Sequence, residues 1–515
     1  MYFNLKVFAL VMLVAIAVFA IGRPVFTRFM TAEDFTRRRN LWLLLSAASF
    51  LSPNMWVYVL IAAPALLLMG ARDPNPIAMY FFVLLAVPPV QVAIPTFGLI
   101  GQLFRMDHLR LLSLTLLLPL AFRLHADRRQ VVGGGASPGA GLRAPDAFLL
   151  AFLGLQVILT LPYDTVTTTG RRIVLLFLDI VLPYFVVSRA CRDRSMITEA
   201  MAAFVIGVAV LVPLGGFEFF KGWMLFAGIE THWEAERLYF SLFRGPFLRA
   251  QATAGHSIFL GYFMALAFGM WLYLHGRVAA KGLRWLCVLT LIAGLIVPLA
   301  RGPWIGAATI LLVYLALGPN ASRRVLKGGV LVALVCAALF ISPWGDQVLD
   351  YLPFVGTVDE HTVTQRQQLA AGSWLLIQQN PFFGSRYFLA YMEEFRTGEG
   401  IIDIVNTYAV VALSYGLVGV GLFVGVFVAA AWQAFNLVRR LTVQDPDAAA
   451  LGAVLVACIV GTLLVLATTS FLHAMPYVVW SLLGLTVAYV RSGAVELSGS
   501  PAAVGPGTPP QPSFR

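Results

Sequence analysis

Long apolar runs alternate with short polar segments along almost the whole chain of 515 residues. A helix that crosses a membrane needs about 20 consecutive, mostly apolar residues. The pattern therefore predicts an all-α polytopic membrane protein with about 12 to 14 transmembrane helices, allowing that length for each crossing. The runs lie near 5–22, 41–69, 76–97, 109–124, 146–163, 173–188, 197–216, 254–275, 285–300, 302–318, 328–342, 405–435, 448–470 and 474–490.

Two of these runs contain prolines that interrupt helices. Pro53, within 41–69, leaves either one long helix or a hairpin of two shorter ones, and we favour the hairpin. Pro88 and Pro89 lie within 76–97. Because proline removes a helical hydrogen bond, that run is either broken or only partly inserted.

Composition supports a membrane protein. Hydrophobic residues make up 59% of the chain and charged residues 12%, whereas soluble domains carry roughly 25% charged residues. A net charge of +11 could indicate a nucleic-acid partner, but the basic residues form short clusters between apolar runs. Cytoplasmic loops of membrane proteins show this pattern. We therefore expect membrane lipids, and no nucleic acid, among the partners.

The basic clusters also predict the orientation. They fall on alternate loops, which we expect to be cytoplasmic: 122–145, 189–194, 277–284, 323–327 and 439–440. The opposite side then receives 162–172, 217–253, a short link near 300, and 343–404. The Arg-rich segment 23–40 joins the cytoplasmic side only if Pro53 forms a hairpin.

These boundaries divide the chain into six parts. We expect N-terminal transmembrane helices at 1–121, a flexible cytoplasmic loop at 122–145, central transmembrane helices at 146–342 with an outer loop at 217–253, a large extracytoplasmic loop at 343–404, C-terminal transmembrane helices at 405–491, and a disordered cytoplasmic tail at 492–515.

Charged residues at membrane depth or at its rim are costly, so they are functional candidates. Arg301 lies in a tight Arg-Gly-Pro turn between two apolar runs. Its guanidinium can fork onto phosphate oxygens, or it serves as an interfacial anchor. Arg249 shortly precedes His256 at the head of another run. Alternatively, Arg249 is an ordinary loop charge at a helix entry, and His256 is a hydrogen-bonding residue at the start of a helix.

Other charges break the expected pattern. Arg171 and Arg172 lie on a predicted outer loop, against the positive-inside bias, and hint at an anionic ligand. Asp179 lies within an apolar run, so we expect it to pair with an arginine on a neighbouring helix.

The stretch 343–404 is the longest polar segment. From Gln365 to Gly384 it predicts an amphipathic helix that ends near Pro381 and helps to cover a cleft at the membrane surface. Arg366 either points into that cleft or is a solvated charge. Most acids nearby are interpreted as solvated, and one could act as a general base; they include Glu360 and Asp403.

Several kinds of site are disfavoured. The sequence has no Walker loop, no His and Cys cluster with metal-ligand spacing and no Gly-x-Ser-x-Gly elbow. ATP-driven transport and serine hydrolysis are therefore not supported, and no metal or cofactor is expected.

The segment from about 245 to 420 resembles the O-antigen ligase and Wzy-type polysaccharide polymerase superfamily of bacterial inner membranes. The resemblance rests on residues that occur in a set order: Arg249 before the run headed by His256, the Arg301 turn, a long outer loop with Arg366 and Asn380-Pro381-Phe382-Phe383-Gly384, and Asn406 followed after nine residues by Gly416 and then by Gly419.

This resemblance implies a metal-independent, inverting glycosyl transfer in the bacterial inner (cytoplasmic) membrane, with an active site that faces the periplasm. The donor would be a glycan linked to undecaprenyl pyrophosphate, and the acceptor a hydroxyl of a glycan or lipid. The product would be a polymerised exopolysaccharide or O-antigen, or a ligated one. A departing pyrophosphate needs positive charge beside it, which suits arginine.

We accordingly expect catalytic roles for Arg301, Arg249, Asp403 and His256. Substrate-binding roles are expected for Arg366, Asn406, Arg171, Arg172, His361 and Glu360.

One position departs from the pattern of the ligase branch, where a histidine commonly precedes the motif asparagine. Here that position is Val405. The base could then be Asp403, Glu360, His361 or His256, or the acceptor needs little base because the transition state is oxocarbenium-like.

Two other functions stay open. A transporter (flippase) of lipid-linked oligosaccharide should carry charges across several mid-span positions, often with duplicated halves. A glycosyltransferase that uses a polyprenyl-phosphate sugar should show an acidic pair in its first outer loop, and Glu33 and Asp34 superficially fit. The side on which 23–40 lies distinguishes this last class.

Overall fold

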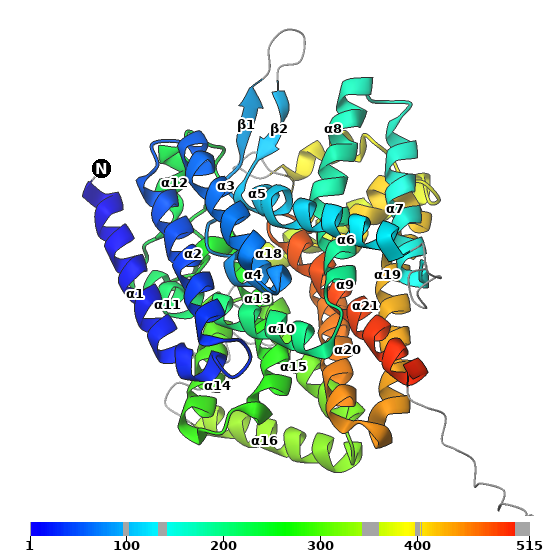
Figure 1. Cartoon of the computed structure of the whole chain (residues 1–515). Helices are drawn as coiled ribbons and strands as arrows, with labels where there is room; N and C mark the ends of the chain where they lie inside the picture. Colours follow the sequence, from blue (N-terminus) through cyan, green and yellow to red (C-terminus); the bar gives the residue numbers. More distant parts are fainter. Residues whose placement is uncertain are drawn as a thin grey trace, which may run out of the picture.

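The computed structural model describes residues 2–95, 102–131, 142–341, 360–396, 402 and 404–499. Within them the chain is helical apart from two short hairpins and the connecting segments (Figure 1). The first part comprises α1 (Tyr2–Phe26), α2 (Ala32–Leu51), α3 (Met55–Arg72), α4 (Pro76–Val83), β1 (Val92–Pro95), β2 (Gln102–Met106), α5 (His108–Leu112), η1 (Ser113–Leu117), α6 (Leu118–Val131), α7 (Ala144–Thr160), α8 (Val166–Leu176), η3 (Phe177–Val186) and α9 (Val187–Ala190).

The second part of the chain is also mainly helical. It comprises α10 (Arg194–Ala209), α11 (Leu211–Lys221), α12 (Ala227–His232), β3 (Phe243–Arg244), β4 (Phe247–Leu248), η4 (Ala252–Ala254), α13 (Ser257–Leu274), η5 (His275–Arg277), α14 (Lys281–Ile296), α15 (Arg301–Leu317), α16 (Ala321–Ile341), α18 (Glu360–Gln379), η6 (Phe388–Phe395), α19 (Thr407–Gln444), α20 (Pro446–Leu466) and α21 (Met475–Gly499).

The all-α polytopic fold class is confirmed. Among the described residues, eight helical stretches are long and apolar enough to cross a membrane: Leu5–Phe26, Met55–Arg72, His108–Asp127, Val166–Ala190, Arg194–Lys221, Ser257–Arg277, Thr407–Gln444 and Pro446–Leu466. Two shorter apolar helices, α7 and α15, accompany them. The total of 12 to 14 crossings stays a prediction.

Both interrupted runs are divided in the structure. Helix α2 ends at Leu51, and Asn54 begins α3 by accepting hydrogen bonds from the backbone N–H groups of Trp56 and Val57, both at 3.0 Å. The favoured hairpin is therefore present, because Asn54 caps a new helix directly after Pro53. The run 76–97 stops being helical at Val83, and it ends in the antiparallel β1–β2 hairpin.

Ion pairs gather the predicted cytoplasmic loops at one end of the bundle, which we call the basic end. Arg277 pairs with Asp447 at 2.6 Å, and Arg194 pairs with Asp445. Helix α6 joins them through Asp127, whose carboxylate lies 2.8 Å from Arg192.

The segment 23–40 also lies at the basic end. Arg38 is fully buried, and its guanidinium lies 2.7 Å from Asp73 and 2.7 Å from Glu199. Glu199 belongs to the first turns of α10, directly after the basic cluster 189–194. The acidic pair Glu33 and Asp34 therefore shares an end with the basic loops, which removes the main support for a polyprenyl-phosphate-sugar enzyme.

The predicted outer segments meet at the opposite end, which we call the site end. Arg386 and Asp164 form an ion pair at 3.0 Å that joins the 380s to the link between α7 and α8. Arg105 of β2 pairs with Glu236 of the segment 217–253. Figure 1 places the β1–β2 hairpin and α8 together at this end.

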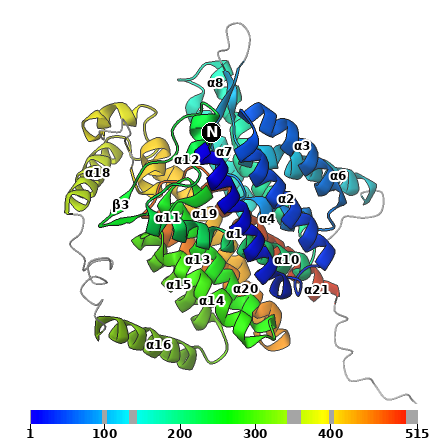
Figure 2. The same ribbon diagram turned by 90° about the vertical axis from the view of Figure 1, so that its left-hand side faces the viewer.

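Buried helices α10, α13 and α20 form the centre of the bundle, and the first turn of α13 lies at the site end. One expectation fails at the periphery. Residues 328–341 of that run form the second part of α16, which lies across the basic end instead of along the bundle in Figures 1 and 2. The first turns of this helix carry Arg323, Arg324 and Lys327, long basic side chains of a kind that favours an interface with water.

Candidate active site

The Arg301 turn is held by the segment that carries Arg249. The Nε of Arg249 donates to the Pro298 carbonyl at 3.3 Å, and Arg244 donates to the Leu299 carbonyl at 2.7 Å. One residue after Arg249, the Ala250 N–H donates to the Val297 carbonyl at 3.2 Å. The structure therefore brings together the two arginines that sequence analysis had placed on separate loops, and adds Arg244 to them.

Two further elements contact this turn at glycines. A Cβ at Gly261 of α13 would lie 2.9 Å from Pro303 and 3.4 Å from Ala300. A Cβ at Gly302 would lie 2.2 Å from the Oγ1 of Thr468, in the link between α20 and α21. Neither position has room for a side chain, so α13 and the 467–473 link pack directly against the backbone that positions Arg301.

Glu218 organises the loop that carries Arg249. Its fully buried carboxylate accepts hydrogen bonds from three backbone N–H groups, those of Leu225 at 3.0 Å, Gln251 at 2.8 Å and Ala252 at 2.8 Å. Bonds to an ionised acceptor are stronger than neutral ones. Sequence analysis missed Glu218; its one signal was an acid set among phenylalanines at the end of an apolar run.

Two histidines lie near each other, and one of them, His256, lies close enough to Arg249 to feel its charge. His256 caps α13, since its Nδ1 accepts from the Ile258 N–H at 3.1 Å, and its ring lies 5.3 Å from that of Phe259. The centroid of the Phe259 ring also lies 5.9 Å from that of the His473 ring, so Phe259 contacts both histidines. Burial, followed by the electrostatic influence of Arg249 and of His473, lowers the pKa of His256 to about 3.

His473 was missed by sequence analysis. Burial lowers its pKa to about 4, and its buried Nδ1 has no hydrogen-bond partner among the described residues. A histidine in the short polar link between the last two apolar runs was the available signal. Both rings are therefore neutral at pH 7 and can accept a proton, and the Nδ1 of His473 is not engaged in a cap.

Backbone strain concentrates at the same place. Of five non-glycine residues with positive φ in the described part of the chain, three lie here: Ala252 at 43°, Leu299 at 46° and His473 at 53°. They follow Arg249, precede Arg301 and belong to the histidine pair, respectively. Such conformations cost energy and gather at functional sites, where the surrounding structure imposes them.

The glycine motif proves to be an interlock between two segments, which we call the glycine interlock (380–385 and 413–418). Gly416 breaks α19 with φ 66° and ψ −171°. Around this break the Leu417 N–H donates to the Pro381 carbonyl at 2.8 Å, and the Ser385 N–H donates to the Leu413 carbonyl at 2.7 Å. Gly384, at φ 67°, completes the contact.

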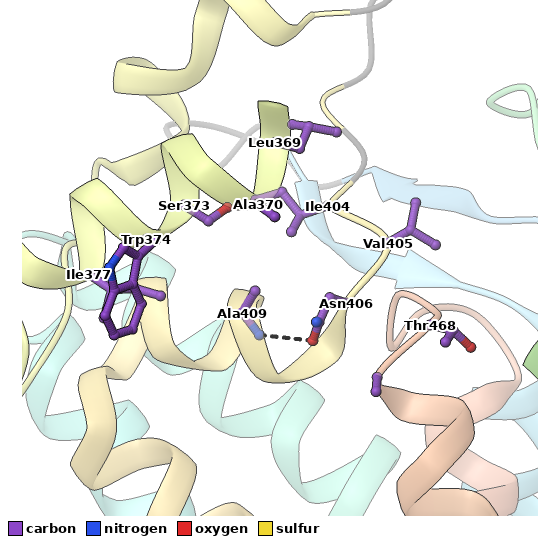
Figure 3. Close-up of a pocket in the computed structure, with 11 residues that line it drawn as sticks. Leu369, Ala370, Ser373, Trp374, Ile377, Ile404, Val405, Asn406, Ala409 and Thr468 are labelled. Atoms are coloured by element: carbon purple, nitrogen blue, oxygen red, sulfur yellow. Dashed lines mark hydrogen bonds between the residues drawn. The ribbon is translucent and has the colours of Figure 1, made fainter. Parts of the chain in front are cut away.

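Asn406 acts first as a helix cap. Its Oδ1 accepts from the backbone N–H groups of Tyr408 at 3.0 Å and Ala409 at 3.2 Å, which begins α19 (Figure 3). Its position is fixed from the other side too, because the Thr407 hydroxyl donates to the Thr469 carbonyl at 2.7 Å. Asn406 thus begins α19, and the next residue, Thr407, joins this helix to the link that contacts Gly302.

A cavity of about 340 Å³ lies beneath α18, and we call it the α18 cavity. Helix α18 forms one wall, the start of α19 a second, and the end of α20 a third (Figure 3). Its lining combines polar and apolar side chains: Leu369, Ala370, Ser373, Trp374, Ile377, Ile404, Val405, Asn406, Ala409, Ala467 and Thr468. The predicted helix therefore does cover a cleft, and Thr468 links that cleft to the Arg301 turn.

A second, more polar cavity of about 210 Å³ lies next to the glycine interlock; we call it the tyrosine pocket. Arg172 lines it, and donates to the Tyr415 hydroxyl and to Gln156. Arg171 does not line it; its guanidinium donates to the Gln102 carbonyl at 2.6 Å. Only one arginine of the predicted pair therefore lies at a cavity here.

The remaining predicted residues divide into two groups. Asp403 lies outside the described residues, and so do the side chains of Glu360, His361 and Arg366, whose backbone forms the start of α18. Asp179 has the predicted partner on a neighbouring element, because its carboxylate lies 2.8 Å from the guanidinium of Arg110.

Comparisons with known proteins agree with this arrangement. No curated protein matches the chain. Residues 285–424 match the family model described as O-antigen ligase. That segment contains the Arg301 turn, α18 and the glycine interlock. The match confirms the resemblance for residues 285–424, and it supports membrane glycan ligation or polymerisation at the level of the family.

Proposed function

We propose that the protein transfers a glycan from undecaprenyl pyrophosphate to a hydroxyl of a glycan or lipid acceptor, at the periplasmic face of the bacterial inner membrane. The observation that carries the proposal is the convergence of Arg244, Arg249 and Arg301 on one strained backbone turn beside a cavity. Donor, acceptor and orientation are part of the proposal.

In this reaction the acceptor oxygen attacks the anomeric carbon, and the bond from that carbon to the pyrophosphate oxygen breaks. The electron pair leaves with the pyrophosphate, while the acceptor proton passes to a base. A single displacement inverts the anomeric configuration. Negative charge thus grows on the leaving group, where fixed cationic donors stabilise the transition state more than the ground state.

Arginine suits that task better than a solvated ion would. Its planar fork binds two phosphate oxygens at once, and it stays protonated at any physiological pH. Arg249 and Arg301 are fixed by the backbone bonds of Pro298 and by the start of α15, so little reorganisation is needed during reaction. The reaction is then independent of divalent metal.

The acceptor proton needs a neutral base near the arginines. Burial keeps His256 and His473 neutral at pH 7, so each ring offers a nitrogen to the proton, and the Nδ1 of His473 is free of intramolecular bonds in the described part of the chain. Their low pKa values make them weak bases, which suits an oxocarbenium-like transition state that needs little base. We therefore assign the proton to His473, with His256 as its neighbour. Asp403, Glu360, His361 and Arg366 remain candidates from the sequence.

A transporter of lipid-linked oligosaccharide is the second candidate. The arginines Arg244, Arg249 and Arg301 gather at the site end, whereas a transporter should carry charges across several mid-span positions. The two functions differ in their products, since a transporter leaves the glycosidic bond to pyrophosphate intact.

The test is reconstitution of the full chain in vesicles with undecaprenyl-pyrophosphate-linked oligosaccharide and a glycan acceptor. We expect transfer without ATP and in the presence of EDTA. Arg301→Ala should reduce the rate by about 10²–10³-fold, as loss of one preorganised donor does, and Arg301→Lys should restore only part of it.

The matched control is Arg192→Ala, which removes an exposed arginine at the basic end. It should retain the wild-type rate. Full activity in Arg301→Ala would contradict the role of this arginine, and a requirement for ATP or for a divalent ion would contradict the proposed reaction.

A further inference from the structure

The tyrosine pocket is separate from the α18 cavity but adjoins it. Helix α19 connects them, because Asn406 lines the α18 cavity and Tyr415 lines the tyrosine pocket. Nine residues of helix separate these positions, or about 14 Å at 1.5 Å per residue. That interval suits an oligosaccharide that extends from one cavity to the other better than a single sugar ring.

Two tyrosines stand at the opening of the pocket. Tyr163 and Tyr387 are 58% and 56% exposed, and their rings meet edge to face with centroids 5.7 Å apart. Side chains of this kind offer an apolar ring face and a polar tip. A pyranose ring offers the complementary pair of surfaces, a face of C–H bonds and an edge of hydroxyl groups.

The charges inside the pocket are unbalanced. Arg386 is neutralised by Asp164, whose two carboxylate oxygens lie 3.1 and 3.0 Å from its guanidinium. Arg172 instead has only neutral partners among the described residues, namely Gln156 and Tyr415, and its buried Nε has none. Arg172 is partly buried, and a guanidinium without an anionic partner can bind a carboxylate through two parallel hydrogen bonds.

From these observations we propose that the tyrosine pocket is a subsite for an acidic sugar of the transferred or accepting glycan, with the sugar ring against Tyr387 and its carboxylate on Arg172. This inference rests on the proposed function for the source of the glycan. Its chemistry, a pyranose bearing one negative charge, follows from the pocket alone.

Several polar groups can bind the hydroxyls of that sugar. Asn380, Ser385 and Ser414 line the pocket together with the main chain of the glycine interlock. Small ligand sites typically combine an apolar surface with a few convergent polar groups of this sort. The interlock thereby fixes the polar edge of the subsite, while the two tyrosines form its accessible face.

The test is direct binding, which needs no catalysis. The full chain in nanodiscs is titrated with a tetrasaccharide that contains glucuronic acid, and with the same tetrasaccharide after reduction of its carboxyl groups. We expect the acidic form to bind at least tenfold more tightly. Tyr387→Ala should weaken its binding about tenfold, and Arg172→Gln should remove the preference for the acid.

Tyr391→Ala is the matched control, because Tyr391 is 68% exposed and lies outside the pocket lining. It should bind like the wild type. Equal affinity for the acidic and reduced tetrasaccharides, or unchanged binding in Tyr387→Ala, would overturn the subsite. Because Arg301→Ala should retain binding while losing transfer, failure of the proposed reaction and failure of the subsite are distinguishable.

Turnover assays then separate the two sources of the glycan. If the donor occupies the pocket, Tyr387→Ala raises the KM for the lipid-linked donor; if the acceptor does, it raises the KM for the acceptor. An unchanged KM for both substrates would contradict the subsite.

Discussion

Replacement of Gly416 by alanine tests the glycine interlock directly. At φ 66° and ψ −171°, Gly416 occupies a region that is essentially restricted to glycine. A Cβ there would lie 2.1 Å from the carbonyl carbon and oxygen of Phe382 and 2.4 Å from the nitrogen of Phe383. These are backbone atoms, so no rotation of a side chain can relieve the clash.

The magnitude follows from two effects. Holding a non-glycine residue in such a conformation costs about 1–3 kcal/mol, and overpacking adds about 1–3 kcal/mol. The sum is about 2–6 kcal/mol, a large part of the roughly 5–15 kcal/mol by which folded proteins are stable. Gly421 offers a matched change in the same helix, because a Cβ there meets nothing within 4 Å. Its replacement by alanine should stabilise α19 by about 0.5–1 kcal/mol.

The assay is thermal unfolding of the purified chain, followed by tryptophan fluorescence, with glycan transfer measured in parallel. Gly416→Ala should unfold at a lower temperature than the wild type and lose transfer, while Gly421→Ala should unfold at the same or a higher temperature and keep it. If the two variants were equally stable, the interlock would not constrain the fold.

Three other predictions concern charged groups. Asp179→Ala should destabilise the fold by about 1.5–3 kcal/mol, because it removes the hydrogen-bonded ion pair with Arg110 and leaves, among the described residues, only the more distant Asp107, at 4.0 Å, as its carboxylate partner. Arg192→Ala at an exposed pair should cost less than about 1 kcal/mol; chemical denaturation of both variants measures the difference. Glu218→Gln should weaken three backbone hydrogen bonds and speed hydrogen exchange at Gln251 and Ala252, and unchanged exchange would show that the carboxylate does not order this loop. Because the pKa of His473 is about 4 in the folded chain and about 6.5 in an unfolded one, its contribution to stability is present above pH 6.5 and is lost as the pH falls toward 4. His473→Gln should flatten the pH dependence of the unfolding temperature, and an identical dependence would refute the assignment.

Much of the fold was predictable because membrane helices leave a strong local signal. Proline and asparagine at 53 and 54 end one helix and cap the next, so the hairpin follows from residues adjacent in sequence. The apolar run 328–342 led to a wrong expectation, because the length of an apolar run carries no information on the direction in which its helix lies. The direction of α16 depends on contacts at the basic end of the bundle that the apolar run does not encode.

The site was predictable only in part. Arg249 and Arg301 stood out because each is a charge at an apolar boundary. Glu218 and His473 did not, because their importance depends on contacts with residues distant in sequence. The glycine motif was visible as a pattern. Its structural role depends on backbone hydrogen bonds to Pro381 and Phe382, and no spacing rule identifies these partners.

Several residues that complete the cavities lie outside the matched segment 285–424. Arg172 comes from the earlier helix α8, Arg249 from an earlier connecting segment and Thr468 from a later link, yet each touches or lines the same surfaces. Transplanting this segment alone into a relative would therefore carry Arg301 and the interlock without their partners. Exchange of substrate preference between such enzymes should require the transfer of at least three separate stretches of chain, so their specificities are expected to change by coordinated substitutions instead of by the swapping of one module.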